Sequence, residues 1–130
     1  MSNYLVVFLG SGLGGVLRYG LGGLIQHAWG PTFPLGTLFV NLTGCLGIGF
    51  CAAAFSGVVL VREEIRIGIL IGVFGGYTTF SSFGRETLAL VHDSEWFRAA
   101  LYVFLTNGLG LLAVWLGHAT ASRIYGLGAP

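Results

Sequence analysis

The stretch Ile67–Gly84 reads IGILIGVFGGYTTFSSFG, and it contains no charged residue. Extended to Val91, it has the length of a membrane span, because a transmembrane helix needs about 20 mostly apolar residues. Its second half contains Gly-Gly, Thr-Thr and Ser-Ser pairs. Gly and Thr are poor helix formers, and Ser and Thr side chains compete for backbone hydrogen bonds. We therefore predict a membrane-spanning helix over Ile67–Val91 that is broken in mid-membrane.

Two aromatic residues, Phe80 and Phe83, lie three positions apart beside these hydroxyl groups. A break at membrane depth is tolerated only inside protein or against water or an ion. The edge of an aromatic ring is electropositive, so phenyl edges next to hydroxyl and amide donors suit a small anion. The pair therefore either fills an apolar core or lines the path of an anion.

The composition extends the membrane interpretation to the rest of the chain. Of 130 residues, 55% are apolar and 8% are charged, and six Arg against five acidic residues give a net charge of +1. Soluble domains contain about 25% charged residues, which excludes a soluble enzyme of ordinary composition. The sequence has neither a basic patch for nucleic acid nor a Ser-His-Asp, Cys-His or HExxH set, so we expect no enzyme and no nucleic-acid partner.

Charged residues and prolines divide the chain into four apolar segments. Arg62–Arg66 and Arg85–Arg98 are polar interruptions, and Gln26–Pro34 reads as a loop because proline cannot donate a backbone hydrogen bond. We predict an all-α integral membrane protein whose residues 1–130 form one domain of four transmembrane helices: Tyr4–Ile25, Leu35–Val61, Ile67–Val91 and Arg98–Arg123.

Arginine is distributed almost evenly between the two ends of these helices. One end has three arginines, and the other has one with two more nearer the membrane: Arg62, Arg66 and Arg123 against Arg98, Arg85 and Arg18. The positive-inside rule then gives only a weak preference for either orientation. We expect the chain to insert into the membrane in both orientations, which suggests an antiparallel homodimer.

Small residues recur at helical spacing along two of the predicted helices. Gly68, Gly72 and Gly76 lie on one face of the third helix, and Gly10 with Gly14 on one face of the first. Such ridges let helix backbones approach closely in lipid. They predict tight helix packing, although backbone exposed to an ion or to a partner would have the same pattern.

The second and fourth helices also contain polar residues. An amide in hydrocarbon must find partners, so Asn41 either joins two helices or lines a wet path. Tyr102 and Thr106 lie four positions apart and share one face of the fourth helix.

Three motifs resemble those of a known family, the Fluc (CrcB) fluoride channels. They are Gly14–Tyr19 (GGVLRY), Gly36–Gly44 (GTLFVNLTG) and Gly75–Phe83 (GGYTTFSSF). The resemblance covers all four helices, and the third motif is the most specific. It implies an antiparallel, dual-topology homodimer in the cell inner (plasma) membrane, with two pores that export fluoride passively and protect the cell.

The resemblance also implies roles for single residues in the pore. Phe80 and Phe83 correspond to the phenylalanines that line the pores, and Asn41 to a polar residue beside them. Tyr102 and Thr106 belong to a polar track on the fourth helix. Two departures from the family pattern are Ser82 for Thr, which keeps the hydroxyl, and Gly110 for Ser, which removes a donor from that track.

Residues around the predicted break and at the entrance have further implied roles. Thr79 and Ser81 supply hydroxyl groups, and Arg18 lies in a vestibule, where its charge raises the local anion concentration. Backbone carbonyls of Gly75 and Thr78, from both subunits, bind a central structural Na⁺ at the dimer interface.

The main alternative is a small proton-coupled exporter of cationic compounds. Such a transporter needs a carboxylate inside the membrane. The acidic residues here lie near predicted helix ends or loops, and Glu86 is the only candidate.

Overall fold

The computed structural model describes residues 2–127, which fold into four long helical segments. The first two are single helices, α1 (Asn3–Trp29) and α2 (Leu35–Ala54). The other two combine α-helix with a wider, π-helical turn. They consist of α3 (Glu63–Ile67), η1 (Gly68–Val73), α4 (Phe74–Tyr77) and α5 (Phe80–His92), and of α6 (Trp96–Phe104), η2 (Leu105–Leu109) and α7 (Gly110–Tyr125).

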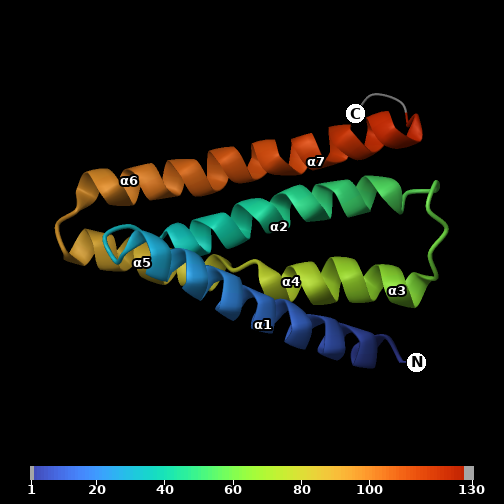
Figure 1. The fold of residues 1–130 in the computed structure, drawn as a ribbon, viewed down its shortest axis with the longest axis horizontal. Coiled ribbons are helices and arrows are strands. Elements are labelled where there is room, and N and C mark those ends of the chain that lie inside the picture. Colours follow the sequence, from blue (N-terminus) through green and yellow to red (C-terminus); the bar gives the residue numbers. More distant parts are fainter. Residues whose placement is uncertain (1, 128–130) are drawn as a thin grey trace.

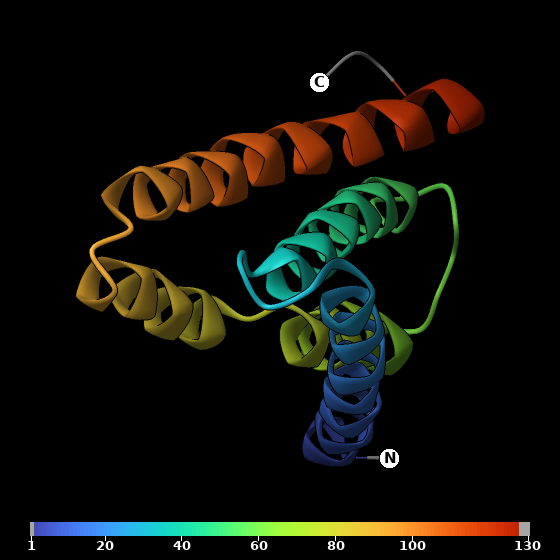
Figure 2. The ribbon, with the colours of Figure 1, turned by 60° about the vertical axis from the view of Figure 1, so that its left-hand side comes forward.

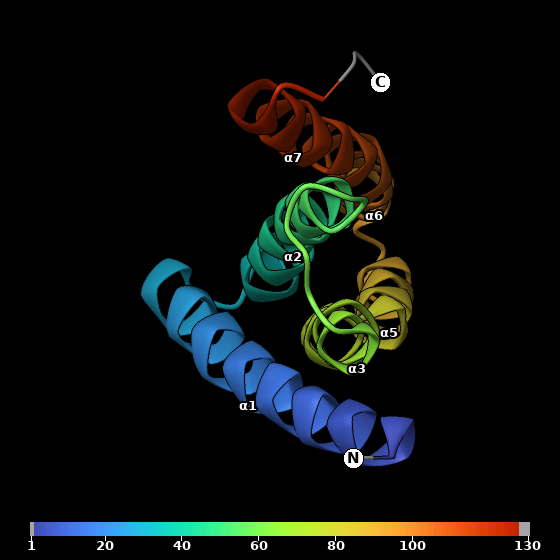
Figure 3. The same cartoon turned by 90° about the vertical axis from the view of Figure 1, so that its right-hand side faces the viewer.

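The segments run back and forth along the long axis of the molecule (Figure 1). The α1–α2 and α5–α6 connections lie at one end, and the α2–α3 connection lies at the other, together with the start of α1 and the end of α7. Seen end-on, α2 lies between α7 and the third segment (Figure 3). The most extensive contact of α2 is with α7, whereas α1 packs mainly on η1 and α4.

Each segment is long and apolar enough to cross a membrane: Asn3–Trp29, Leu35–Ala54, Glu63–His92 and Trp96–Tyr125. The prediction of an all-helical chain with four spans is therefore confirmed. The third segment begins earlier than expected, at Glu63, because the acidic residues Glu63 and Glu64 occupy its first turn, where negative charge is favourable.

The second helix is shorter than predicted, since it ends at Ala54 and not at Val61. The Ser56 hydroxyl donates to the carbonyl of Ala53, at 2.6 Å, and Gly57 has a φ of +145°, which L side chains rarely adopt. The chain turns here toward α3. Because residues 55–61 are uncharged, charge alone did not mark this turn in the sequence.

Glycines bring α1 against the third segment, as their spacing predicted. A Cβ atom on Gly14 would collide with the carbonyl of Val73, and one on Gly76 with the carbonyl of Ser11. Helix association in lipid gains from such close packing of backbones. This seam fixes the third segment immediately before the residues that form the candidate site.

A second glycine contact, which was not predicted from the sequence, joins α2 to α7. A Cβ atom on Gly49 would collide with the carbonyl of Val114, and one on Gly117 with the carbonyl of Leu46. The two helices therefore cross with their backbones in contact.

Candidate functional site

The third segment is interrupted between α4 and α5. Thr78 (φ −79°, ψ 156°) and Thr79 (φ −150°, ψ 117°) have extended backbones, and the ribbon is unwound there (Figure 2). Asn41 of α2 bonds to this backbone twice: its Nδ2 donates to the Thr79 carbonyl at 3.1 Å, and its Oδ1 accepts from the Thr79 N–H at 2.8 Å. The side chain therefore replaces the helical hydrogen bonds that the interruption removes.

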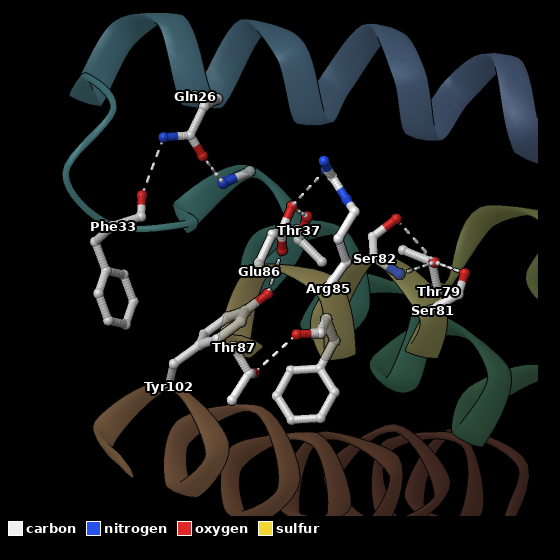
Figure 4. A network of polar contacts seen from close by, with 12 residues as sticks. Gln26, Phe33, Thr37, Thr79, Ser81, Ser82, Arg85, Glu86, Thr87 and Tyr102 are labelled. Carbon is white, nitrogen blue, oxygen red and sulfur yellow. Dashed lines mark hydrogen bonds and ion pairs between the residues drawn. The ribbon is translucent and has the colours of Figure 1, made fainter. Parts of the chain in front are cut away.

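Hydroxyl groups gather where α5 begins. Thr79 caps the helix, since its Oγ1 accepts from the Ser82 N–H at 3.1 Å. The same oxygen lies 3.1 Å from the Ser82 hydroxyl and 3.3 Å from the Ser81 hydroxyl (Figure 4). Thr79 is buried, whereas Ser81 is exposed. The structure thus brings together Asn41, Thr79 and Ser81, three of the predicted site residues.

A row of aromatic rings leads away from this cluster. The ring centroids of Phe80 and Phe83 are 5.4 Å apart, and those of Phe83 and Tyr102 are 5.2 Å apart, all in tilted arrangements. Phe83 and Tyr102 are buried, but 79% of Phe80 is exposed. Two of the three rings therefore belong to the core of this chain, while the third faces outward.

Glu86 joins the site, although the sequence suggested it only as the carboxylate of an exporter. It lies within α5 and accepts hydrogen bonds from the Thr37 hydroxyl at 2.8 Å and the Tyr102 hydroxyl at 2.7 Å (Figure 4). The sequence could have shown that Glu86 lies near the site, because it follows Phe83 by three positions and residues three apart share a helix face. Glu86 therefore links α2, α5 and α6.

Charges of both signs face a cavity of about 540 Å³ between α1, α2 and α5. Arg18, Ser82 and Glu86 are among its lining residues. The Nη1 of Arg18 donates to the carbonyl of Thr78 across a long contact of 3.4 Å. The cavity thus connects the predicted vestibule residue to the interruption and to the Glu86 cluster.

The remaining predicted residues lie at the edges of this arrangement. The Thr106 hydroxyl is buried and has no hydrogen-bond partner within residues 2–127. Gly75, in α4, is exposed and has open space where a Cβ would be. Gly110 lies close to Cys45, because a Cβ there would be 3.7 Å from the Cys45 sulfur.

The sequence of the chain is similar to those of known proteins. The family model described as "CrcB-like protein, Camphor Resistance (CrcB)" matches residues 5–118. A protein named fluoride-specific ion channel FluC, from Paramagnetospirillum magneticum, is 47% identical and aligns with 95% of this chain and 98% of its own length. Proteins of the same name from Opitutus terrae (48% identical, 93% of each chain) and Thermus thermophilus (44% identical, 97% of this chain and 100% of the relative) are also similar.

The family model reaches into all four spans, and the three relatives are 44–48% identical over nearly the whole chain. The chain is a multi-pass membrane protein. It belongs to the CrcB family.

Proposed function

We propose that this protein is a fluoride-selective channel that exports fluoride passively across the cell inner (plasma) membrane and so relieves fluoride toxicity. The relatives carry the name of a fluoride-specific channel. The observation that carries the proposal within this chain is the row Phe80–Phe83–Tyr102 beside the hydroxyl cluster of α5. This combination of ring edges and hydrogen-bond donors suits a small anion.

Fluoride is strongly hydrated, so its pathway must replace water with good donors. The amide nitrogen of Asn41 carries two hydrogens, and Thr79 accepts one of them. The Ser81 hydroxyl is exposed, and the buried Thr106 hydroxyl has no partner among the described residues. As the ion moves, these donors and the edges of Phe80 and Phe83 would solvate it one after another.

The charges around the pathway favour entry without tight binding. Arg18 lines the 540 Å³ cavity, where its charge would raise the local anion concentration. Tyr102 and Thr37 donate to the Glu86 carboxylate, which reduces its repulsion of an anion. Deeper in the pathway the ion would contact hydroxyl groups, an amide and ring edges. These uncharged groups bind an anion weakly enough to favour rapid passage.

We also propose that the channel is an antiparallel, dual-topology homodimer with two pores. Phe80 supports this, because its exposed ring leaves the aromatic row open on one side of a single chain. A second copy would close that side. The even distribution of arginine supports insertion in both orientations.

A structural Na⁺ between the two copies is a further part of the proposal. The Thr79 N–H donates to Asn41, so the Gly75 carbonyl lacks its usual helical partner four residues on. Carbonyl oxygens suit a hard cation, and the long Arg18 contact to the Thr78 carbonyl is weak enough to be replaced. Gly75 and Thr78 of both copies would hold the ion and join the two interruptions.

The Na⁺ proposal predicts that replacing Na⁺ by a large organic cation lowers fluoride efflux from liposomes and weakens the dimer. Fluoride efflux and cross-linking yield are measured in the same samples. If both are unchanged after exhaustive exchange of Na⁺, the carbonyls have no such role.

The channel itself is tested by anion efflux from liposomes that contain the purified protein, without a proton gradient. Fast loss of fluoride with negligible loss of chloride is expected, measured with ion-selective electrodes. Efflux that requires an opposing proton gradient would point to an exporter. Absence of efflux from correctly dimeric protein would overturn the channel.

A further inference from the structure

The aromatic row continues beyond Tyr102 to a fourth ring, in the α1–α2 connection. The rings of Phe33 and Tyr102 pack edge to face, with centroids 5.5 Å apart and an angle of 79° between the ring planes. Edge-to-face pairs of this kind are favourable beyond the area they bury. The row therefore runs from Phe80, at the interruption, to Phe33, at the end of the bundle where the α1–α2 and α5–α6 connections lie.

The connection that carries Phe33 is held by one side chain. The Gln26 Nε2 donates to the carbonyls of Gly30, at 2.5 Å, and Phe33, at 3.0 Å. The Gln26 Oε1 accepts from the Gly36 N–H at 3.1 Å, in the first turn of α2 (Figure 4). A single amide thus ties the end of α1, the connection and the start of α2 together, and it fixes the backbone of Phe33.

Tyr102 is consequently held from two directions. Its hydroxyl donates to Glu86 at 2.7 Å, which fixes the tip of the side chain. Phe33 and Phe83 contact its ring, at centroid distances of 5.5 and 5.2 Å. The hydrogen bond to Glu86 fixes only the hydroxyl, whereas the packing of Phe33 against the ring restricts the rotation of the ring itself.

Gln26 and Glu86 also lie between two cavities. Both residues line the 540 Å³ cavity that contains Arg18, and both line a second cavity of about 290 Å³ beside Thr32 and Asp93. The second cavity lies at the connection end of the bundle. The Gln26 side chain, with its hydrogen bonds to the α1–α2 connection, therefore lies between the two cavities and keeps them apart.

We propose that Gln26 and Phe33 are positioning residues for ion conduction: Gln26 fixes the α1–α2 connection, and Phe33 holds Tyr102 against Phe83. This inference rests on the proposed channel function. It extends the set of residues that control the pathway to a connection that none of the sequence motifs includes.

The test compares Phe33→Ala, Phe33→Leu, Phe33→Tyr and Gln26→Leu with the wild-type dimer in liposomes. The matched control is Phe50→Ala, because Phe50 pairs with Tyr125 at 6.3 Å, away from the row. Fluoride efflux is expected to fall about five- to tenfold in the Ala and both Leu variants, and to stay within about twofold for Phe33→Tyr and Phe50→Ala.

A second measurement reports on Tyr102 without conduction. The ¹⁹F resonance of Tyr102 in protein labelled with 3-fluorotyrosine, assigned with a Tyr102→Phe variant, should shift in Phe33→Ala and Gln26→Leu. It should remain in place in Phe50→Ala. Phe33→Leu keeps an apolar side chain without the ring, so it provides the same comparison if Phe33→Ala does not form a dimer.

The outcomes separate the two proposals. A wild-type protein that does not conduct overturns the channel function, whereas the Tyr102 resonance still tests the positioning of Tyr102. Efflux near the wild-type rate in Phe33→Leu and Gln26→Leu overturns the positioning role alone. So does an equal loss in Phe50→Ala, or a loss with an unchanged Tyr102 resonance.

Discussion

The amide of Asn41 supports the backbone of the third segment at Thr79, in the interruption between α4 and α5. Both polar groups of Thr79 are buried with it, and both bond to the Asn41 side chain. Of the two roles that the sequence left open, joining helices is therefore what the side chain does in the structure. Lining the anion path remains a proposal, since the second amide hydrogen is compatible with both roles.

Replacing Asn41 by Ala should destabilise the protein by about 2 kcal/mol or more, because it leaves a buried N–H and a buried carbonyl without partners. Thermal unfolding in detergent measures the change. Asn107→Ala is the matched control: Asn107 is exposed, and within residues 2–127 its amide bonds only to the Val103 carbonyl of its own helical segment. If the Asn41→Ala and Asn107→Ala proteins were equally stable, the Asn41 side chain would not be what supports the Thr79 backbone.

The two phenylalanines should respond differently to replacement by Ile. Phe83 is 6% exposed, so Phe83→Ile should lower the free energy of unfolding by about 1 kcal/mol through imperfect packing. Phe80 is 79% exposed, and Phe80→Ile should change it by less than about 0.5 kcal/mol.

Both Ile variants should nevertheless conduct fluoride much more slowly than the wild type while the dimer still forms. Liposome efflux and cross-linking, measured together, test this. Loss of folding in both variants, or efflux at the wild-type rate, would instead favour a purely structural core.

At the scale of the helices, the seam between α1 and the third segment is built from backbone contacts. Gly14 has no room for a methyl group because the Val73 carbonyl and the Tyr77 N–H lie against it. Gly12, on the same helix, has no atom within 4 Å of a Cβ position. The two glycines therefore separate the effect of packing from the effect of helix propensity.

Gly14→Ala should cost about 1–3 kcal/mol through overpacking, whereas Gly12→Ala should be neutral or stabilise by about 0.5–1 kcal/mol through helix propensity. Unfolding in detergent measures the change in the free energy of unfolding for each variant and shows whether it is a loss or a gain. A stable Gly14→Ala protein would mean that α1 moves away from η1 and α4 at little cost.

Much of the element level could be predicted from the sequence, and the exceptions have physical causes. Charged clusters end apolar spans, so the fourth segment, predicted over Arg98–Arg123, was found close to its true limits, Trp96–Tyr125. The loop predicted over Gln26–Pro34 begins too early, because α1 continues to Trp29 and only the residues after it form the connection. The turn after Ala54 was missed because its residues are uncharged. The pairing of Asn41 with Thr79, and of Glu86 with Thr37 and Tyr102, depends on how different helices meet, which spacing within one helix does not encode.

At the scale of the molecule, one chain exposes apolar side chains along its outer faces, and the positive and negative charges at each end nearly cancel. Lipid can cover such faces, and so can another copy of the chain. The proposed dual topology makes a direct prediction about accessibility, because both ends of the bundle would then face outward in part of the population.

Cysteines at opposite ends test this in a Cys45→Ala, Cys51→Ala background. Asp93→Cys lies at the α5–α6 end, and Val58→Cys lies in the α2–α3 connection at the other. An impermeant maleimide added to intact cells should label both variants partially. Complete labelling of one variant and none of the other would establish a single orientation.

The crossing of α2 and α7 at Gly49 and Gly117 also bears on biosynthesis. The helix that fills the closest backbone contact of α2 is made after all the other described spans have left the ribosome. Until then α2 must wait in the membrane with its glycine face uncovered, while α1 and the third segment can already pair. The contact between α2 and α7 is therefore the last of these glycine contacts to form, and any chain that lacks its fourth span leaves the glycine face of α2 uncovered.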